Sequence, residues 1–195
     1  DGIGYEGAIV IAPKIGMYLD TPIAVLDFNS LYPSSMIGEN LSPDTLVSKK
    51  IYNEAGKLLP DLCEGMTAEK TKTLDNIREV SYVEDGKKCV CTYIQPTADQ
   101  PLSLGLIPTA LQIMLAKRKE ARKKMEDPKL DDAQKSVYNG LQLAYKVVAN
   151  SIYGQLGSRT SPIRKMCIAA CTTAVGRRSL LFAKSTVEAD GADVV

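Results

Sequence analysis

Two helical patterns that follow one another along the chain constrain the fold more than any other feature of the sequence. The first runs from Pro108 to Glu126 and ends at Asp127-Pro128, because a proline disfavours helix in the residue before it. The second begins at Asp131 or Asp132, runs to about Tyr153, and is ended by the glycines that follow. Two long helices joined by so short a turn predict an antiparallel hairpin. The apolar positions expected to pack are Leu111, Met114 and Leu115 in the first helix and Val137, Leu141, Ala144, Tyr145 and Val148 in the second.

The strand signals are shorter. Residues 8–12 and 23–28 are β-prone apolar runs, and the second is apolar on both faces, which predicts a buried central strand that ends at Asp27. Residues 191–195 read as a further strand just beginning. Residues 46–105 mix strand-like stretches with turns, and we expect an irregular insertion or a strand-rich excursion there, not a separate domain.

Two further helices are predicted outside the hairpin. A helix-compatible segment follows Pro33 and continues through Asn40, with Ser34 or Ser35 able to cap it. A last helix, rich in alanine and threonine, is expected from about 168 to 189, where Gly176 would permit close packing.

Composition excludes several kinds of site. The 195 residues carry a net charge of +1, so no overall basic field indicates nucleic acid, although six basic residues gather between Lys117 and Lys124. The sequence has no histidine, which excludes a Ser–His triad, a Cys–His pair and a Cys/His zinc site.

Five cysteines without a secretory signal favour reduced thiols in an intracellular setting, and Cys167 and Cys171 are expected in the core. No apolar run approaches the roughly 20 residues of a membrane span. The chain begins with Asp1 in place of Met, and both ends look cut from a longer protein.

Asp27 is the first candidate for chemistry. A carboxylate at the end of a buried strand is costly unless it is paired or binds a metal ion. Mg²⁺ takes one or two carboxylates together with phosphate oxygens, and the turn-like backbone after Asp27 can present N–H groups to a triphosphate. The plain alternative is a turn or capping aspartate.

Cationic side chains on the two hairpin helices are the second candidate site. Residues spaced by four and seven share one stripe of a helix, and antiparallel helices could turn both stripes toward one groove. Cations suited to a polyphosphate would then come from both helices. The alternative is that the charged stripes are simply the solvated face of an amphipathic hairpin. The stripes are Arg118 and Arg122 in the first helix and Lys146, Asn150, Tyr153 and Gly154 in the second.

Five segments together resemble family B DNA polymerases, in the family's order and at compatible spacing. The segment Asp27-Phe-Asn-Ser-Leu-Tyr-Pro-Ser34 resembles the first palm motif, and Lys146-Val-Val-Ala-Asn-Ser-Ile-Tyr-Gly154 resembles the fingers motif. Pro108 to Met125 is similar to the other fingers helix, and Tyr5-Glu-Gly-Ala8 to the short motif between the exonuclease and polymerase regions. Cys167 to Leu180 resembles the palm helix that leads to the second carboxylate motif. The resemblance covers nearly the whole chain except about 46–100.

The resemblance implies a role for each matching residue. Asp27 would bind the catalytic metals, and the backbone from Phe28 to Leu31 would contact metal and triphosphate. Tyr32 would stack under the sugar and exclude a ribose 2′-hydroxyl. Arg118, Arg122 and Lys146 would bind the triphosphate, and Ser30 and Leu31 would contact the dNTP. Asn150 would support the nucleotide and the primer-terminal pocket. Tyr153 and Gly154 would line the nascent base pair and the minor groove, and Tyr5 and Gly7 would touch the template strand.

The sequence departs from the family pattern at three points. Arg122 stands where lysine is common, and Ala8 stands in place of a second glycine. The second carboxylate motif, Tyr-Gly-Asp-Thr-Asp, is missing and is expected to begin directly after Val195. Because two-metal phosphoryl transfer needs carboxylates from both motifs, the 195 residues alone are expected to be inactive.

The resemblance also implies the architecture and its partners. We expect an α+β fold: a partial palm with an antiparallel sheet in residues 1–105 and 155–195, and a two-helix fingers hairpin in 106–154. Two Mg²⁺ ions, dNTPs and a DNA primer–template are the implied ligands, with a sliding clamp as a partner of regions outside this sequence and no membrane. The implied location is the nucleus or a viral replication site. The motifs most resemble those of delta-like polymerases of large double-stranded DNA viruses, and those of cellular delta-type enzymes are the second choice. Two other readings stay open: a non-catalytic nucleic-acid-binding module on the same scaffold, and a structural hairpin protein in which Asp27, Lys146 and Arg118 lie far apart.

Overall fold

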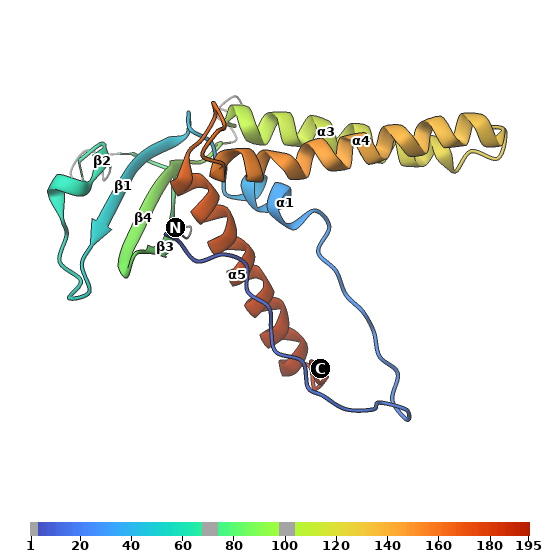
Figure 1. The fold of residues 1–195 in the computed structure, drawn as a ribbon, viewed down its shortest axis with the longest axis horizontal. Helices are drawn as coiled ribbons and strands as arrows, with labels where there is room; N and C mark the ends of the chain where they lie inside the picture. Colours follow the sequence, from blue (N-terminus) through green and yellow to red (C-terminus); the bar gives the residue numbers. More distant parts are fainter. Residues whose placement is uncertain (1–3, 68–73, 98–103) are drawn as a thin grey trace.

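The computed structural model describes residues 4–67, 74–97 and 104–195, and it has an α+β fold (Figure 1). A four-stranded antiparallel sheet packs on one long helix, and a two-helix arm projects from their junction. This arrangement confirms the expected fold class. The helices are α1 (Leu31–Gly38), α3 (Leu106–Met125), α4 (Asp132–Gly157) and α5 (Met166–Ala189), with a short 3₁₀ turn η1 (Pro60–Leu62), and the strands are β1 (Leu46–Tyr52), β2 (Glu64–Gly65), β3 (Ile77–Glu84) and β4 (Lys87–Ile94).

The sheet lies within residues 46–94, the stretch whose sequence pattern was weakest. Its strand order is β2-β1-β4-β3, with every neighbouring pair antiparallel. β3 and β4 form a hairpin with Glu84 opposite Lys87. The turn between them places Asp85 and Gly86 at positive φ, a geometry that Asp-Gly adopts readily in two-residue hairpins. The expectation of a strand-rich excursion is therefore confirmed.

One face of the sheet forms the core with α5. Alternate residues of β3 and β4 are buried on this face, as the two-residue period of a strand requires. The helix places Cys167, Ile168 and Cys171 against them, each at most 5% exposed. The prediction that Cys167 and Cys171 are small core residues is confirmed, and all five cysteines are free thiols. The sheet residues of this core are Val80, Tyr82, Cys89, Cys91 and Tyr93.

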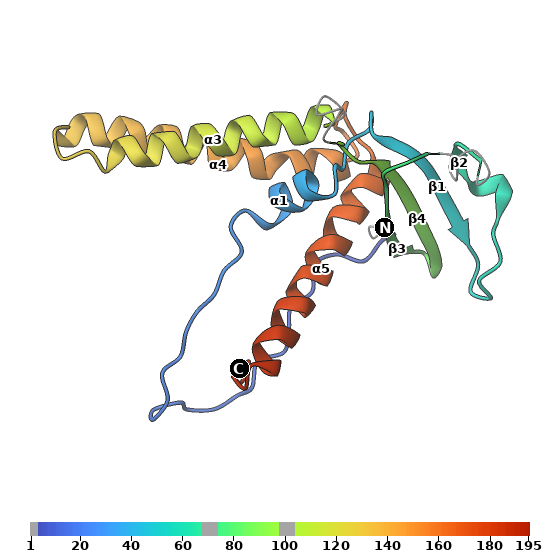
Figure 2. The same ribbon diagram turned by 180° about the vertical axis from the view of Figure 1, so that it is seen from behind.

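The hairpin prediction is confirmed, but its second helix packs differently from expectation. Helices α3 and α4 lie side by side and project away from the sheet (Figures 1 and 2). Leu111 is fully buried, as predicted, whereas Val137 and Val148 are 69% and 47% exposed. Two helices on an arm cover only the stripe that each turns to the other, so most of the apolar face expected on α4 lies exposed. The buried residues of α4, Ala149 and Leu156, lie toward the base of the arm.

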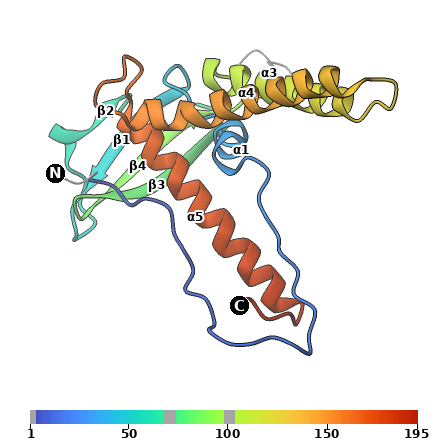
Figure 3. The same cartoon turned by 45° about the vertical axis from the view of Figure 1, so that its right-hand side comes forward.

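The strands expected at residues 8–12, 23–28 and 191–195 do not form. These residues are irregular backbone, and 8–28 runs out alongside α5 and returns to α1 (Figure 3). Asp27 therefore does not end a buried strand, and Val10 and Val25 are 89% and 90% exposed. A strand needs a neighbour for its N–H and C=O groups, and the described residues pair no strand with these runs.

Helix α1 begins earlier than its sequence indicated. The residue before it, Ser30, has φ 53° and makes no side-chain capping bond. Ser34 and Ser35, the expected caps, lie inside the helix, where their hydroxyls donate to the carbonyls of Asn29 and Leu31 at 2.8 Å. The capping prediction is wrong because these hydroxyls reach backward to carbonyls and do not accept from N–H groups.

Helix α5 extends over 24 residues and is, by length and composition, apolar enough to cross a membrane. Half of its most apolar window is buried inside the structure, and core helices of globular proteins pass the same test. The buried residues of α5 all lie between Cys167 and Gly176, and the helix packs on β3, α1 and α4.

Candidate functional site: the junction of α1 with the hairpin

The N-terminal turn of α1 lies where three other helices meet. The ring of Tyr32 in this turn lies 4.5 Å, centroid to centroid, from the ring of Tyr153 in α4, tilted by 43°. Just before the turn, the hydroxyl of Ser30 accepts from Nη1 of Arg118 in α3 at 3.5 Å. Residues predicted from three separate motifs are thus brought into contact.

Tyr5 joins this group from the opposite end of the sequence. Its hydroxyl lies 3.4 Å from that of Tyr153, and only 8% of its surface is exposed. We call Tyr5, Tyr32 and Tyr153 the tyrosine cluster. Burial raises the pKa of Tyr153, and the hydrogen bond with Tyr5 raises it further. Burial also raises the pKa of Tyr32, an effect that Arg177 partly opposes. The phenols of Tyr32 and Tyr153 are therefore neutral at physiological pH and act as rings and hydrogen-bonding groups.

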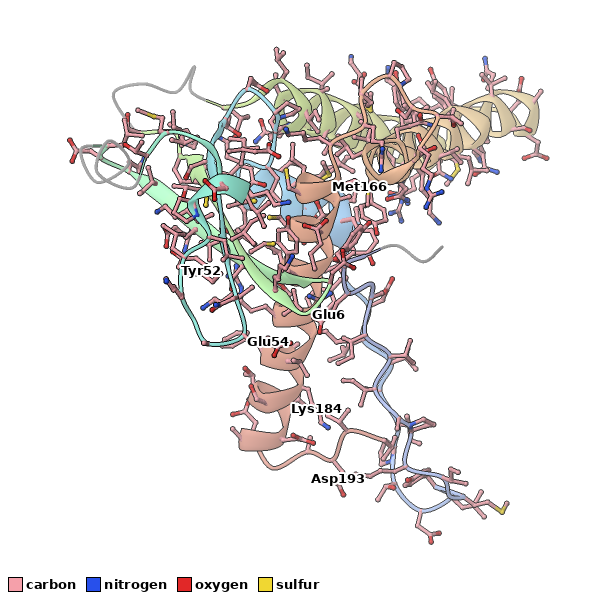
Figure 4. All side chains as sticks on the ribbon, turned by 60° about the vertical axis from the view of Figure 1, so that its left-hand side comes forward. Glu6, Tyr52, Glu54, Met166, Lys184 and Asp193 are labelled. Carbon is pink, nitrogen blue, oxygen red and sulfur yellow. The ribbon has the colours of Figure 1, made fainter. Side chains whose placement is uncertain are left out.

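Two residues of α5 hold the segment that carries Tyr5. Nη1 of Arg177 donates to the carbonyls of Glu6 at 2.5 Å and Gly7 at 2.6 Å, and its Nη2 lies 3.1 Å from the Glu6 carboxylate. The hydroxyl of Thr173 donates to the Glu6 carbonyl at 2.9 Å. Figure 4 shows Glu6 lying beside α5. No sequence pattern assigns this role to Arg177 or Thr173, because only the fold brings them beside a segment some 170 positions away.

The start of α3 is capped by the loop that follows α1. The backbone N–H groups of Gly105, Leu106 and Ile107 donate to side-chain oxygens of Asn40 at 2.8 Å, Asp44 at 3.0 Å and Ser42 at 3.3 Å, respectively. A helix start leaves several N–H groups without partners inside the helix, and these side chains supply them. Capping side chains normally come directly before a helix, so no local pattern indicates a cap that comes from 62 to 65 residues earlier.

The predicted cations differ in how the structure holds them. Arg118 is half-buried, and its Nε donates to Oε1 of Gln142 in α4 at 3.4 Å. Arg122, Lys146 and Asn150 are exposed, and their side chains make no hydrogen bond or ion pair with another described residue. The charges of Arg122 and Lys146 are therefore not neutralised within the described chain and are open to an anionic ligand.

The family profile described as "DNA polymerase family B" matches residues 1–195, the whole chain. The chain belongs to DNA polymerase family B. Members of this family act on DNA and nucleotides and generally use divalent metal ions.

Relatives of viral and cellular origin support the assignment. A DNA polymerase of Phaeocystis pouchetii virus is 38% identical over 95% of this chain, and the DNA polymerase delta catalytic subunit of Caenorhabditis elegans is 38% identical over 96%. The family B polymerase of Pyrobaculum calidifontis superimposes with a TM-score of 0.58 at 29% identity over 95% of the chain. The chain spans about a fifth of the length of these polymerases, 19%, 14% and 20% respectively.

Within this family B chain, the two residues predicted to bind metal lie outside the regular elements. Asp27 and Phe28 lie in the irregular segment before α1, and Phe28 is 38% exposed. The Asp27 side chain is exposed and makes no ion pair with another described residue, so its oxygens are accessible to a hard cation. Among the described residues, no three Cys, Asp or Glu side chains form a metal-binding group. The donors present fit part of a magnesium site, namely one carboxylate and a neighbouring carbonyl.

The remaining predicted contacts are placed as follows. Leu31 is the first residue of α1 and is partly buried. Gly154 lies exposed in the last turn of α4. The helix continues past Tyr153 and ends at Gly157, one of the glycines predicted to end it. Gly7 is exposed and held through its carbonyl by Arg177. The contacts of these residues with DNA or nucleotide stay predictions.

Proposed function

We propose that these residues form palm and fingers parts of a DNA-directed DNA polymerase, and that they act within a longer replicative chain. The reaction is template-directed attack of a primer 3′-hydroxyl on the α-phosphate of a dNTP. The observation that carries the proposal is the meeting of Tyr32, Arg118 and Tyr153 at the start of α1. We assign residues 1–105 and 155–195 to the palm and 106–154 to the fingers.

The hairpin is proposed to bind the incoming nucleotide. Arg118, Arg122 and Lys146 supply positive charge for the triphosphate, and guanidinium groups suit phosphate oxygens because they donate in pairs. Asn150 then supports the nucleotide and the primer-terminal pocket. The bond of Arg118 to Ser30 supports this role, because it brings a hairpin cation to the segment proposed to hold the triphosphate. Ser30 and Leu31 contribute backbone contacts to the same phosphates.

The tyrosine cluster is proposed to surround the sugar and the nascent base pair. Tyr32 stacks under the sugar and excludes a ribose 2′-hydroxyl, while Tyr153 and Gly154 line the new pair and the minor groove. Tyr5 and Gly7 contact the template strand. The ring contact between Tyr32 and Tyr153 and the hydroxyl contact between Tyr153 and Tyr5 support a shared surface for these tasks.

Asp27, with the carbonyl of Phe28, is proposed to contribute ligands for two Mg²⁺ ions. Two such ions would stabilise the attacking and leaving oxygens of the phosphoryl transfer. The remaining carboxylate comes from the motif expected after Val195, and the 195 residues alone are therefore proposed to be inactive.

The proposed setting is DNA replication in the nucleus or at a viral replication site, under reducing conditions. A sliding clamp is the proposed further partner, through regions outside this sequence, and an origin in a large DNA virus is proposed ahead of a cellular one.

The deciding experiment is primer extension by the full-length enzyme with Mg²⁺ and all four dNTPs, comparing wild type with Asp27→Ala. We expect the variant to lose activity by orders of magnitude while its melting temperature is unchanged, because the Asp27 side chain makes no ion pair within the described chain. Asp20→Ala is the matched control, since Asp20 is an exposed acid of the same irregular segment. Equal extension by wild type and Asp27→Ala would overturn the metal-binding role of Asp27, and no extension by either protein would favour a non-catalytic nucleic-acid-binding module.

A further inference from the structure

The ring of Tyr32 is confined on two sides. On one side it packs against the ring of Tyr153 at 4.5 Å, and Tyr153 is itself tied to the buried Tyr5. The ring also lies close to α5 at Gly176, a helical and buried position. The position of the Tyr32 ring is thus set by what stands at residue 176 as well as by the hairpin.

Gly176 leaves little room for a side chain. A Cβ atom at this position would lie 3.2 Å from Cε1 and 3.7 Å from Cδ1 of Tyr32, and 3.5 Å from Cδ2 of Leu31. The first of these distances is shorter than ordinary carbon contacts, so the Tyr32 ring would have to move by a few tenths of an ångström. Overpacking of this kind displaces side chains in well-packed regions.

Backbone conformation does not explain the glycine. Residue 176 lies inside a regular helix and is not among the positive-φ positions of the described chain. Inside a helix, glycine is less stable than alanine. The close approach of Tyr32 is therefore the feature that an alanine would disturb.

We propose that Gly176 is a specificity-determining residue that sets the depth at which Tyr32 sits and so how strictly a nucleotide with a 2′-hydroxyl is excluded. The inference rests on the sugar-excluding role proposed for Tyr32. A methyl group at 176 pushes the ring away from α5, and Tyr153 closes one direction of escape. The ring then projects further into the space of the sugar, and a ribonucleotide loses more than a deoxynucleotide.

The test is single-nucleotide insertion by the full-length enzyme, measured as kcat/KM for a dNTP and for the matching rNTP. Gly176→Ala is expected to raise the ratio of the two values by about threefold or more, since small steric changes in a pocket alter discrimination to this degree. Gly140→Ala is the matched control, because Gly140 also lies inside a helix and a Cβ there meets no atom within 4 Å. An unchanged or lowered ratio in folded Gly176→Ala overturns the inference.

Tyr32→Ala separates this inference from the role proposed for Tyr32. The single variant is expected to raise rNTP insertion, and adding Gly176→Ala to it is expected to change the ratio no further. An unaltered ratio in Tyr32→Ala overturns the proposed sugar-excluding role and the inference together. A further change on adding Gly176→Ala overturns the inference alone. Gly176→Ala alone could prove unstable, and the melting temperature of the double variant then decides. A melting temperature restored in Tyr32→Ala/Gly176→Ala supports a clash between residue 176 and the Tyr32 ring, and a melting temperature that stays low overturns the inference.

Discussion

Nη1 of Arg177 lies 2.6 Å from the carbonyl oxygen of Gly7, although the two residues are 170 positions apart in the sequence. The guanidinium also reaches the Glu6 carbonyl and carboxylate, and only 16% of its side chain is exposed. This contact ties the first described segment to α5 and holds Tyr5 under Tyr153. If the Tyr5–Gly7 segment touches the template, α5 determines where it does so.

Removing this contact should weaken DNA binding. We expect Arg177→Ala to raise the Kd for a primer–template roughly tenfold, which corresponds to about 1.4 kcal/mol, because the Tyr5–Gly7 segment is no longer held in place. Fluorescence anisotropy on the full-length enzyme measures the change. Lys184→Ala is the control on the same helix, since the ion pair of Lys184 is with Glu188 of α5 itself, at 3.8 Å. Equal affinities in the two variants would show that the segment needs no such support.

The nucleotide-binding role proposed for Arg118 predicts a change in KM. Hydrogen bonds to charged groups contribute about 1.5–3 kcal/mol, so Arg118→Ala should raise the KM for dNTPs by roughly tenfold to a hundredfold. Steady-state insertion kinetics check this, with Lys119→Ala as the control: Lys119 is the neighbouring, exposed cation on α3. A similar KM for both variants would contradict a specific phosphate contact by Arg118.

The cap that Asn40 provides for α3 predicts a loss of stability. Asn40 is fully buried, accepts from the N–H of Gly105 and donates to the carbonyl of Ile94, each at 2.8 Å. Asn40→Ala leaves those groups without partners, which should destabilise the junction of α1 and α3 by about 2–3 kcal/mol. Thermal unfolding of the full-length enzyme tests this. Asn53→Ala is the control, because the Asn53 side chain accepts from the backbone N–H of Lys57 in an exposed turn. This substitution should lower the melting temperature much less.

Glu39 predicts a second, electrostatic effect on stability. Its carboxylate is 11% exposed and pairs with Arg78 of β3 at 3.0 Å and with Arg178 of α5. Both arginines are 56% exposed, which limits the effect, and we expect Glu39→Gln to cost about 1–2 kcal/mol. The loss should shrink as salt is added in melting experiments. Glu188→Gln, at an exposed pair on α5, should leave the melting temperature nearly unchanged, and an equal loss there would argue against a special role for Glu39.

The sequence by itself determined the elements whose signals are local. The hairpin of α3 and α4, the approximate span of α5 and the turn at Asp85-Gly86 all follow from helical period, proline, glycine and turn residues that act within a few positions. The same holds for the motifs that identify the family, because each is a continuous run of residues. For α4 the structure also decides between the two expected starts: the helix begins at Asp132, and Asp131 caps it by accepting from the N–H of Gln134 at 2.7 Å.

Only the tertiary structure decided which of these residues meet. Residues 8–12 and 23–28 have the apolar, β-branched composition of strands, yet a strand requires a hydrogen-bonding neighbour, and the described chain pairs none with them. The apolar side chains of α4 do follow a helical period, but along the arm only α3, of the described elements, is present to cover them, so most of them are exposed. Conversely, the contacts of Arg177 with Gly7, of Asn40 with Gly105, and of Tyr32 with Gly176 and Tyr153 join residues far apart in the chain. Such contacts depend on how whole helices pack together, which no local run of residues encodes.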